Sequence, residues 1–276
     1  MQFGTAIHEA LEVYWRNARS LQTAIDSLTL TDYDLARARS MLVLYDNKWS
    51  EFLADKQFEI IGAEVPFEEV LFHPTERRTH EHFTITGRID LVLRINGYTV
   101  VVEHKTSSED IGTGSQYRQR LLTDSQVSQY LEGYPEAHFV IWDVLKKPDI
   151  KPLGITKTRK QEESYEEYEI RCLEKLSAEP DRYHALFEVH RNEVQRERFR
   201  RDLWATADLM TVSRLMGIRD RNESACFAKY PCQFVHHCAG MESLGGIYED
   251  ESTVSTQRSD NGPREENLII RDGGGW

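Results

Sequence analysis

The spacing of apolar residues along the chain predicts an alternation of helices and strands. Apolar positions that recur every three or four residues indicate amphipathic helices, and apolar positions that alternate with polar ones indicate strands. The longer period predicts helices over residues 4–18, 32–55, 123–134, 160–178 and 192–217. The two-residue period predicts strands over residues 57–72, interrupted around Pro66, and over residues 82–95, 98–105, 137–145 and 184–191.

This order of elements predicts the α/β fold class, with a mixed β-sheet flanked by helices and a mostly helical C-terminal part. We expect the core to cover residues 1–150. The helical part then covers residues 151–240 and ends in a group of three cysteines. From about Gly245 apolar residues become rare and Ser, Asp, Gly and Glu dominate, so residues 245–276 are expected to form a disordered tail.

The strongest local signal is an Asn-Gly pair at positions 96–97, between the runs GRIDLVLRI and YTVVVEHK. Asn-Gly between alternating apolar residues predicts a hairpin with a two-residue loop. With this loop Ile95 pairs with Tyr98, and the same register places Asp90 directly opposite Glu103. The apolar residues of both strands then share one packed face, and the charged residues share the other.

Two carboxylates at opposed positions require an explanation. Opposed side chains in a hairpin lie about 4.5–5.5 Å apart, where like charges destabilise the pairing. A divalent cation between Asp90 and Glu103 removes the difficulty, because hard cations take carboxylate ligands. Lys105 projects from the same face as Glu103, since side chains alternate along a strand. The alternative interpretation is a solvent-facing sheet surface with mixed charges.

These motifs carry a family resemblance. GRID at 87–90 followed by EHK at 103–105 resembles the PD-(D/E)XK nuclease superfamily, and the GxxD form is similar to its RecB-type exonuclease branch. GTAIHEALE, from position 4, resembles the N-terminal helix motif of that branch, and QVSQY, from position 126, resembles its QxxxY motif. The four motifs follow the family's order. The resemblance implies a restriction-endonuclease-like core.

The resemblance also implies roles for single residues. The implied ligands of Mg²⁺ or Mn²⁺ are His8, Asp90, Glu103 and the backbone carbonyl of His104. Lys105 would position the attacking water or stabilise charge on the phosphate, while Gln126 and Tyr130 would contact the nucleic-acid strand or order the site. Glu64 is a further candidate acid on the preceding strand. Taken alone, a helical histidine is more often a surface or packed residue than a metal ligand, and a core-facing tyrosine with a surface glutamine is the alternative to the QxxxY motif.

Three cysteines, Cys226, Cys232 and Cys238, lie within a short segment, which indicates a metal site more than a disulfide framework. Iron–sulfur RecB-type nucleases, among them CRISPR-associated and phage enzymes, end in a similar group and complete a 4Fe-4S cluster with an upstream cysteine. Here the Gly…His motif follows Met1 almost at once and no cysteine precedes Cys172, so we expect a shortened form with an incomplete cluster or a different fourth ligand. Zinc, or no metal at all, are the alternatives. The candidate fourth ligands are Cys172, His236 and His237.

Composition and charge restrict the partners and the cellular environment that we expect for the protein. A formal net charge of −12 argues against a protein coated in basic patches, but a local groove can still be positive and bind nucleic acid. No stretch approaches the length of a membrane span and no signal peptide is evident, so we expect a cytoplasmic, reducing environment and no membrane partner.

The function expected from these features is a metal-dependent DNA exonuclease in recombination, repair, or phage or CRISPR DNA processing. DNA is the expected partner, together with recombination or CRISPR-adaptation proteins. Two alternatives remain: a restriction- or repair-type endonuclease on the same core, and a non-catalytic DNA-binding subunit of a recombination complex. The Arg-rich run 191–201 is either a phosphate contact or an ordinary solvated helix face.

Overall fold

The computed structural model describes residues 3–218, 223–226, 232–238 and 269–272. The chain divides into two compact units, the first made of residues 1–204 and 261–276 and the second of residues 205–260. This division differs from the boundary expected near residue 150, because the elements between residues 165 and 189 belong to the first unit. In the described parts, no helix has the length and apolar character needed to cross a membrane.

The elements follow the expected alternation. The helices are α1 (Phe3–Arg16), α2 (Leu21–Asp26), α3 (Asp32–Leu53), α4 (Gln116–Thr123), α5 (Ser125–Gly133), α6 (Tyr165–Ala178), α7 (Pro180–Tyr183), α8 (Glu193–Met216), α9 (Glu223–Cys226) and α10 (Val235–Cys238). The strands are β1 (Phe58–Phe72), β2 (Thr79–Ile95), β3 (Tyr98–Ser107), β4 (Phe139–Lys146), β5 (His184–Val189) and β6 (Ile269–Asp272).

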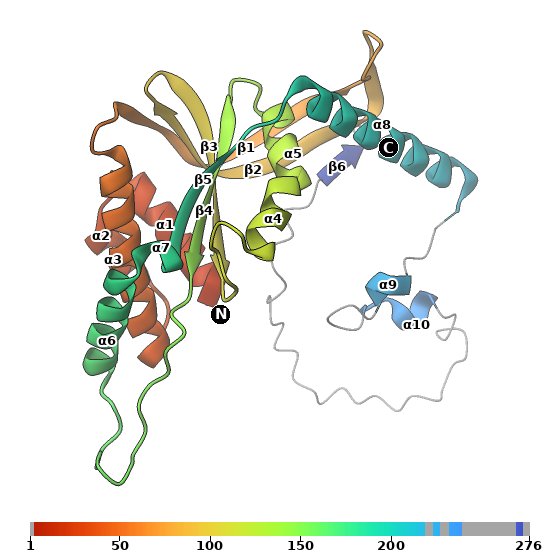
Figure 1. The fold of residues 1–276 in the computed structure, drawn as a ribbon. Helices are drawn as coiled ribbons and strands as arrows, with labels where there is room; N and C mark the ends of the chain where they lie inside the picture. Colours follow the sequence, from red (N-terminus) through yellow and green to blue (C-terminus); the bar gives the residue numbers. More distant parts are fainter. Residues whose placement is uncertain (1–2, 219–222, 227–231, 239–268, 273–276) are drawn as a thin grey trace. The chain divides into compact units, whose positions relative to one another are not determined.

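One mixed sheet organises the first unit (Figure 1). Its strand order is β1-β2-β3-β4-β5, with β3 and β4 parallel and the other neighbours antiparallel. The short β6 pairs with the outer part of β2, within the segment expected to be a disordered tail, most of which lies outside the described residues. A mixed sheet flanked by helices confirms the α/β fold class.

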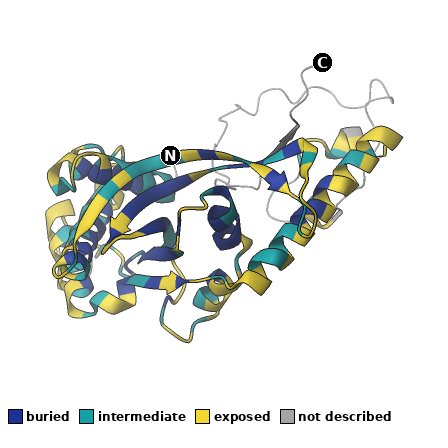
Figure 2. Cartoon of the chain, turned by 90° about the horizontal axis from the view of Figure 1, so that it is seen from above, coloured by how far each residue is buried: buried dark blue, intermediate teal, exposed yellow. Residues whose placement is uncertain are grey.

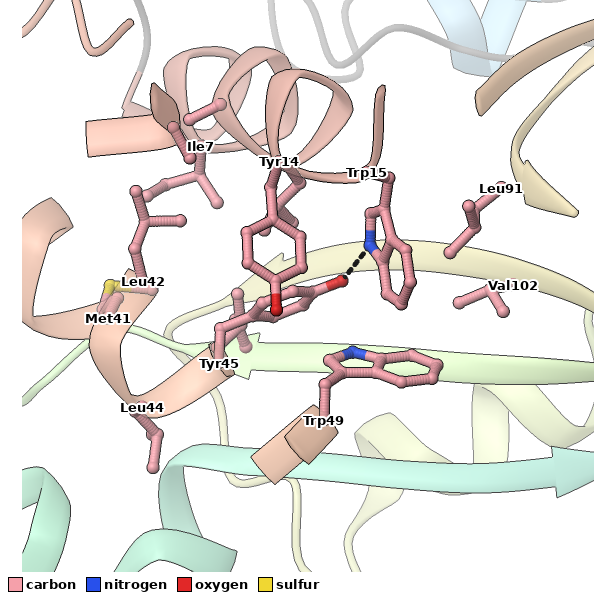
Figure 3. Packing of buried hydrophobic residues seen from close by; sticks show 14 of the residues in the cluster. Ile7, Tyr14, Trp15, Met41, Leu42, Leu44, Tyr45, Trp49, Leu91 and Val102 are labelled. Carbon is pink, nitrogen blue, oxygen red and sulfur yellow. Dashed lines mark hydrogen bonds between the residues drawn. The ribbon is translucent and has the colours of Figure 1, made fainter. Parts of the chain in front are cut away.

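The main core lies between the sheet and helices α1 and α3. Apolar residues of both helices pack on one face of the β2–β3 hairpin, where Leu91 and Val102 are fully buried (Figure 3). Burial is concentrated in the sheet and in the helix faces turned toward it (Figure 2). Within this core the indole of Trp15 donates a hydrogen bond of 2.6 Å to the Tyr45 hydroxyl. This aromatic layer fixes α1 against α3.

Helix α5 packs against β1, β2 and β4, and a ring wedged between two glycines fixes its end. The Phe67 ring occupies the space that a side chain at Gly87 or Gly133 would need. A Cβ atom at Gly87 would lie 2.5 Å from Phe67 Cζ, and one at Gly133 would lie closer still to the same ring. The Phe67 ring also meets Tyr130 edge-on, at a centroid distance of 6.2 Å. Gly87 of the GRID motif is therefore a packing requirement.

The structure differs from the expected elements at three places. Residues 58–72 form one continuous strand, because β1 is paired on one side only among the described strands, and Pro66 is tolerated at such an edge. The helix expected over 123–134 is α5, but a separate helix, α4, precedes it and was not expected; Asp124 ends α4 and caps the start of α5. The short α2 begins at the N-cap Ser20, whose side chain accepts from Thr23 N, and was not expected.

Candidate active site

The predicted hairpin register is confirmed. Ile95 pairs with Tyr98 and Leu91 pairs with Val102, so the loop is the Asn-Gly pair at 96–97. Both loop residues have positive φ, 50° for Asn96 and 87° for Gly97, as a tight primed turn requires.

The ladder ends one pair before the two acids. Beyond Leu91 and Val102 the strands no longer exchange ladder bonds, and Asp90 instead accepts a 2.8 Å hydrogen bond from the backbone N–H of His104. Asp90 and Glu103 are therefore neighbours at the point where the strands separate, and not a ladder pair as the register alone predicted. Both are almost completely buried, at 5% and 1% exposure, which excludes the solvent-facing alternative.

Glu103 is held by three donors. The Lys105 ammonium lies 2.6 Å from one carboxylate oxygen, to which the Gln126 amide also donates at 3.0 Å. The Tyr130 hydroxyl donates to the other oxygen at 2.6 Å. Burial on its own would raise the pKa of Glu103, but the charge and hydrogen bond of Lys105, with the Tyr130 hydrogen bond, outweigh it and leave this pKa below its usual value. Glu103 is therefore an anion at neutral pH.

Helix α5 supplies two of these donors because Gln126 and Tyr130 are four residues apart and share one face. The helix starts at Asp124, whose side chain accepts from Gln126 N. The Gln126 amide also donates to the Tyr130 hydroxyl at 2.7 Å, which completes a closed set of hydrogen bonds around Glu103. The QVSQY motif and the EHK motif thus meet in space, although 22 residues separate Glu103 from Gln126.

His8 and Glu64 approach the same acids from two other elements. His8 Nδ1 on α1 lies 3.9 Å from an oxygen of Asp90, and the charge of a protonated His8 would contribute to the lowered pKa of Glu103. Glu64 falls between two ladder pairs of β1 and β2, beside Asp90, and has a φ of 55° within the strand. A Glu64 oxygen lies 3.5 Å from the Arg88 guanidinium.

The donor chemistry fits a hard divalent cation. Asp90 and Glu103 offer carboxylate oxygens and His8 an imidazole, a set that suits Mg²⁺ or Mn²⁺. Among the described residues no three His, Cys, Asp or Glu side chains are close enough together to hold a metal ion as they are placed. The physical reason is visible in the contacts, since the oxygens of Glu103 are directed at Lys105, Gln126 and Tyr130.

Comparison with known proteins decides the family. A family model of the PD-(D/E)XK nuclease superfamily matches residues 1–239. The chain belongs to this superfamily. Membership implies a metal-dependent nuclease, which is a phosphodiester hydrolase. A solved structure described as the crystal structure of SSO0001 is similar at 17% identity and a TM-score of 0.29, over 71% of this chain and 72% of that one. Among curated proteins none matches.

A second buried carboxylate of this superfamily member escaped the sequence analysis. Asp143 on β4 lies opposite His104 on β3, and it accepts hydrogen bonds from Trp49 Nε1 at 2.7 Å, His104 Nδ1 at 3.1 Å and His184 Nε2 at 2.5 Å. Burial would raise the pKa of Asp143, but the charge of His184 and the hydrogen bonds of both histidines hold it well below its usual value. The signal was present, because Asp143 is the one charged residue inside the apolar run FVIWDVL.

The Asp143 network reaches the EHK motif through one residue. The His104 side chain contacts Asp143 on the α1–α3 side of the sheet, while its backbone N–H binds Asp90. The remaining ring nitrogen of His104 is buried without a hydrogen-bond partner. Its ring meets that of His8 edge-on, with centroids 6.4 Å apart. Asp143 therefore helps to fix the strand that carries Glu103 and Lys105.

The cysteine segment is described only in part. Cys226 and Cys232 are linked by a 2.8 Å hydrogen bond between Cys232 N and the Cys226 carbonyl, and Cys238 follows on α10. Within the described parts of the chain, no disulfide joins these cysteines or Cys172. Cys172 on α6 is fully buried against Ala36 and Tyr168, so packing accounts for it without a metal. A cluster at Cys226, Cys232 and Cys238 stays a prediction.

Proposed function

We propose that this chain is a Mg²⁺- or Mn²⁺-dependent DNA exonuclease. The observation that carries the proposal is the meeting of Asp90, Glu103 and Lys105 where β2 and β3 separate, with Gln126 and Tyr130 closing over Glu103. The exonuclease assignment rests on the resemblance of the GxxD, Gly…His and QxxxY motifs to the RecB-type branch. The same resemblance supports a place in recombination, repair, or phage or CRISPR DNA processing.

Each residue has a task in this proposal. Asp90, Glu103, His8 and the His104 carbonyl would hold the metal, which supplies Lewis-acid activation of the phosphate and of the attacking water. The Lys105 ammonium lies beside Glu103. At this position it would neutralise the negative charge that develops on the phosphate. Gln126 and Tyr130 keep the Glu103 carboxylate in one orientation.

The test compares cleavage of end-labelled linear DNA with cleavage of a closed circle, with Mg²⁺, with Mn²⁺ and with chelator. We expect metal-dependent loss of the linear substrate alone. Glu103→Gln and Lys105→Ala should each lower the rate about 10³-fold, the effect typical of removing one preorganised charged group. Glu109→Gln is the matched control, because Glu109 is an exposed carboxylate on the loop after β3 that pairs with Arg120.

Three outcomes would contradict parts of the proposal. Cutting of the closed circle would identify an endonuclease instead. Unchanged cleavage by Glu103→Gln or Lys105→Ala would contradict the roles proposed for these residues in cleavage. DNA binding without any cleavage in either metal would favour the non-catalytic DNA-binding subunit.

We also propose that Cys226, Cys232 and Cys238 hold an iron–sulfur cluster or zinc, on the basis of their spacing. Elemental analysis and a visible absorption spectrum of anaerobically purified protein test this. A protein with neither iron nor zinc would contradict it.

A further inference from the structure

A basic loop leaves the sheet beside the candidate active site. Residues 147–164, which join β4 to α6, contain five cations and three acids in a chain whose formal net charge is −12. The loop follows β4, whose parallel neighbour β3 carries Glu103 and Lys105. Lys147 N donates to Ser107 O at 2.8 Å, so the loop begins at the end of β3 that carries the motif.

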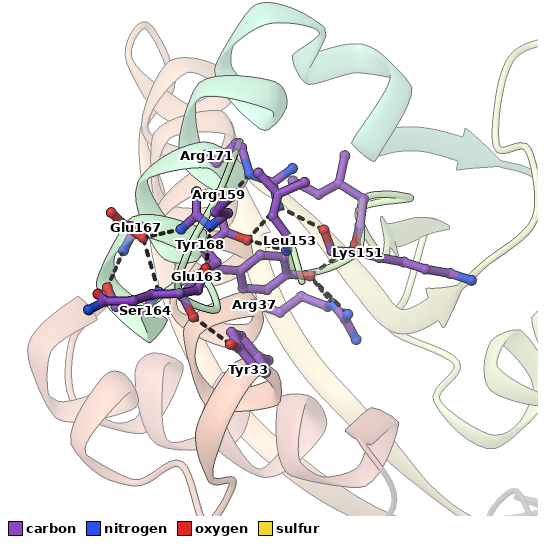
Figure 4. Close-up of polar contacts among 12 residues, drawn as sticks. Tyr33, Arg37, Lys151, Leu153, Arg159, Glu163, Ser164, Glu167, Tyr168 and Arg171 are labelled. Carbon is purple, nitrogen blue, oxygen red and sulfur yellow. Dashed lines mark hydrogen bonds and ion pairs between the residues drawn. The ribbon is translucent and has the colours of Figure 1, made fainter. Parts of the chain in front are cut away.

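The base of this loop is fixed by a buried acid. Glu163 is 3% exposed, accepts from Leu153 N at 2.8 Å and pairs with Arg171 at 2.7 Å (Figure 4). Arg171 also donates to the carbonyl of Lys151, and the Tyr33 hydroxyl donates to the Glu163 carbonyl. The loop is therefore held in one conformation at its base, although it projects from the sheet (Figure 1).

Three acids of this region are paired with arginines, whereas, within the described residues, four lysines of the loop are not paired with carboxylates. Asp149 pairs with Arg182, Glu163 with Arg171, and Glu167 with Arg159. Lys147, Lys151, Lys157 and Lys160 have no carboxylate within ion-pair distance among the residues that the structure describes. The side chains of Lys151, Lys157 and Lys160 are exposed, and in Figure 4 that of Lys151 extends away from the network.

Several arginines of α8, in contrast to these lysines, are paired with carboxylates. Arg196 and Arg200 both bind the Glu132 carboxylate at 2.8 Å, and Arg201 pairs with Glu197. The Arg-rich run at 191–201 is therefore largely satisfied by the protein's own carboxylates, which favours the structural interpretation of that run. The loop lysines have no such partners.

The geometry points to a second role for this loop: we propose that Lys147, Lys151, Lys157 and Lys160 bind the phosphate backbone of DNA that leads to the active site. Lys147 connects the loop to the active site, because its ammonium lies 4.5 Å from the centre of the Phe3 ring on α1, the helix that carries His8. Ammonium groups that are not paired with carboxylates are suited to phosphates, since counterions are released on binding. The inference rests on the proposed nuclease function and names the surface that receives its substrate.

The experiment measures DNA affinity separately from cleavage. Full-length protein carrying Glu103→Gln, in chelator, is titrated with labelled single-stranded and duplex DNA over a range of salt concentrations. The loop variant adds Lys151→Gln, Lys157→Gln and Lys160→Gln. The matched control adds Arg198→Gln, Arg201→Gln and Arg214→Gln, which remove the same charge from α8.

The expected result is a lower salt dependence in the loop variant alone. Each lost phosphate contact lowers the slope of log K against log salt by about 0.7 on single strands and 0.9 on duplex, so three lost contacts lower it by about 2 to 3. Equal loss in the α8 control would show a net-charge effect and overturn the proposal. An unchanged slope, or binding of the loop to phosphatidylserine vesicles in place of DNA, would overturn it too.

The nuclease proposal can fail or hold independently of this result. It is decided by metal-dependent cleavage in the protein with an intact loop. Circular dichroism and thermal unfolding of the loop variant confirm that its fold is unchanged, because the three lysine side chains are exposed.

Discussion

Two buried carboxylates in this protein, Glu103 and Asp143, share nearly every simple property and differ in their surroundings. Each is 1% exposed, accepts hydrogen bonds from three side chains and has a lowered pKa. Glu103 faces α5 and an ammonium, that of Lys105, which is itself 29% exposed. Asp143 lies on the α1–α3 side of the sheet and is enclosed by the Trp49 indole and the imidazoles of His104 and His184.

The difference teaches how to separate a reactive carboxylate from a structural one. Burial and pKa do not distinguish them, since both acids have the same direction of shift. Access to solvent distinguishes the two acids. Lys105, beside Glu103, reaches solvent, whereas every donor to Asp143 lies in the core. The predictions below test this distinction, beginning with the largest effect.

The largest effect is expected from Asp143→Ala, which should lower the free energy of unfolding by about 3–5 kcal/mol because it leaves buried donors without an acceptor. Chemical denaturation measures this. Asp55→Ala is the matched control, since Asp55 forms an exposed pair with Lys56 and its loss should change the free energy of unfolding little. If Glu103→Gln destabilised the fold as much as Asp143→Ala, the distinction between the two acids would fail.

A smaller effect is expected from Tyr130→Phe. This change removes the 2.6 Å hydrogen bond that orients Glu103 and should weaken Mn²⁺ binding or cleavage by about 10- to 100-fold, as is usual for groups that support a metal ligand. Isothermal titration with Mn²⁺ and single-turnover cleavage measure it. Tyr134→Phe is the control on the same stretch of chain. An equal loss in both variants would assign the effect to packing.

The smallest effect is the acid dependence of stability. The pKa of Asp143 is lower in the folded protein than its unfolded value of about 3.9, so its contribution is complete above that value and is lost as the pH falls below it. The stability advantage of the parent over Asp143→Asn should therefore shrink between pH 5 and about pH 3. Urea unfolding across this interval measures the trend, and an advantage that grows on acidification would contradict it.

The sequence predicted those parts of the site that are local. Asn96-Gly97 fixed the register of β2 and β3, and the four-residue spacing of Gln126 and Tyr130 placed both on one face of α5. The register did not reveal that the ladder would end before Asp90, since the separation of strands depends on the surrounding packing.

The run FVIWDVL marks Asp143 as a charged residue in a buried strand, but the partners of Asp143 could not be predicted because they are non-local. The members of this network, Trp49, His104, Asp143 and His184, come from one helix and three strands, and no spacing along the chain links them. The same limit applies to Phe67, whose position between Gly87 and Gly133 depends on how α5 meets the sheet.

The Phe67 ring restricts how Gly87 of the GRID motif can vary among homologues. With Phe67 in place, a larger residue at Gly87 or Gly133 collides with the ring, so a side chain at either glycine requires a smaller residue at 67. Among homologues we expect a side chain at either glycine to be accompanied by a smaller residue at 67. A combinatorial library that varies the three positions jointly should yield folded variants that single-site mutagenesis never recovers.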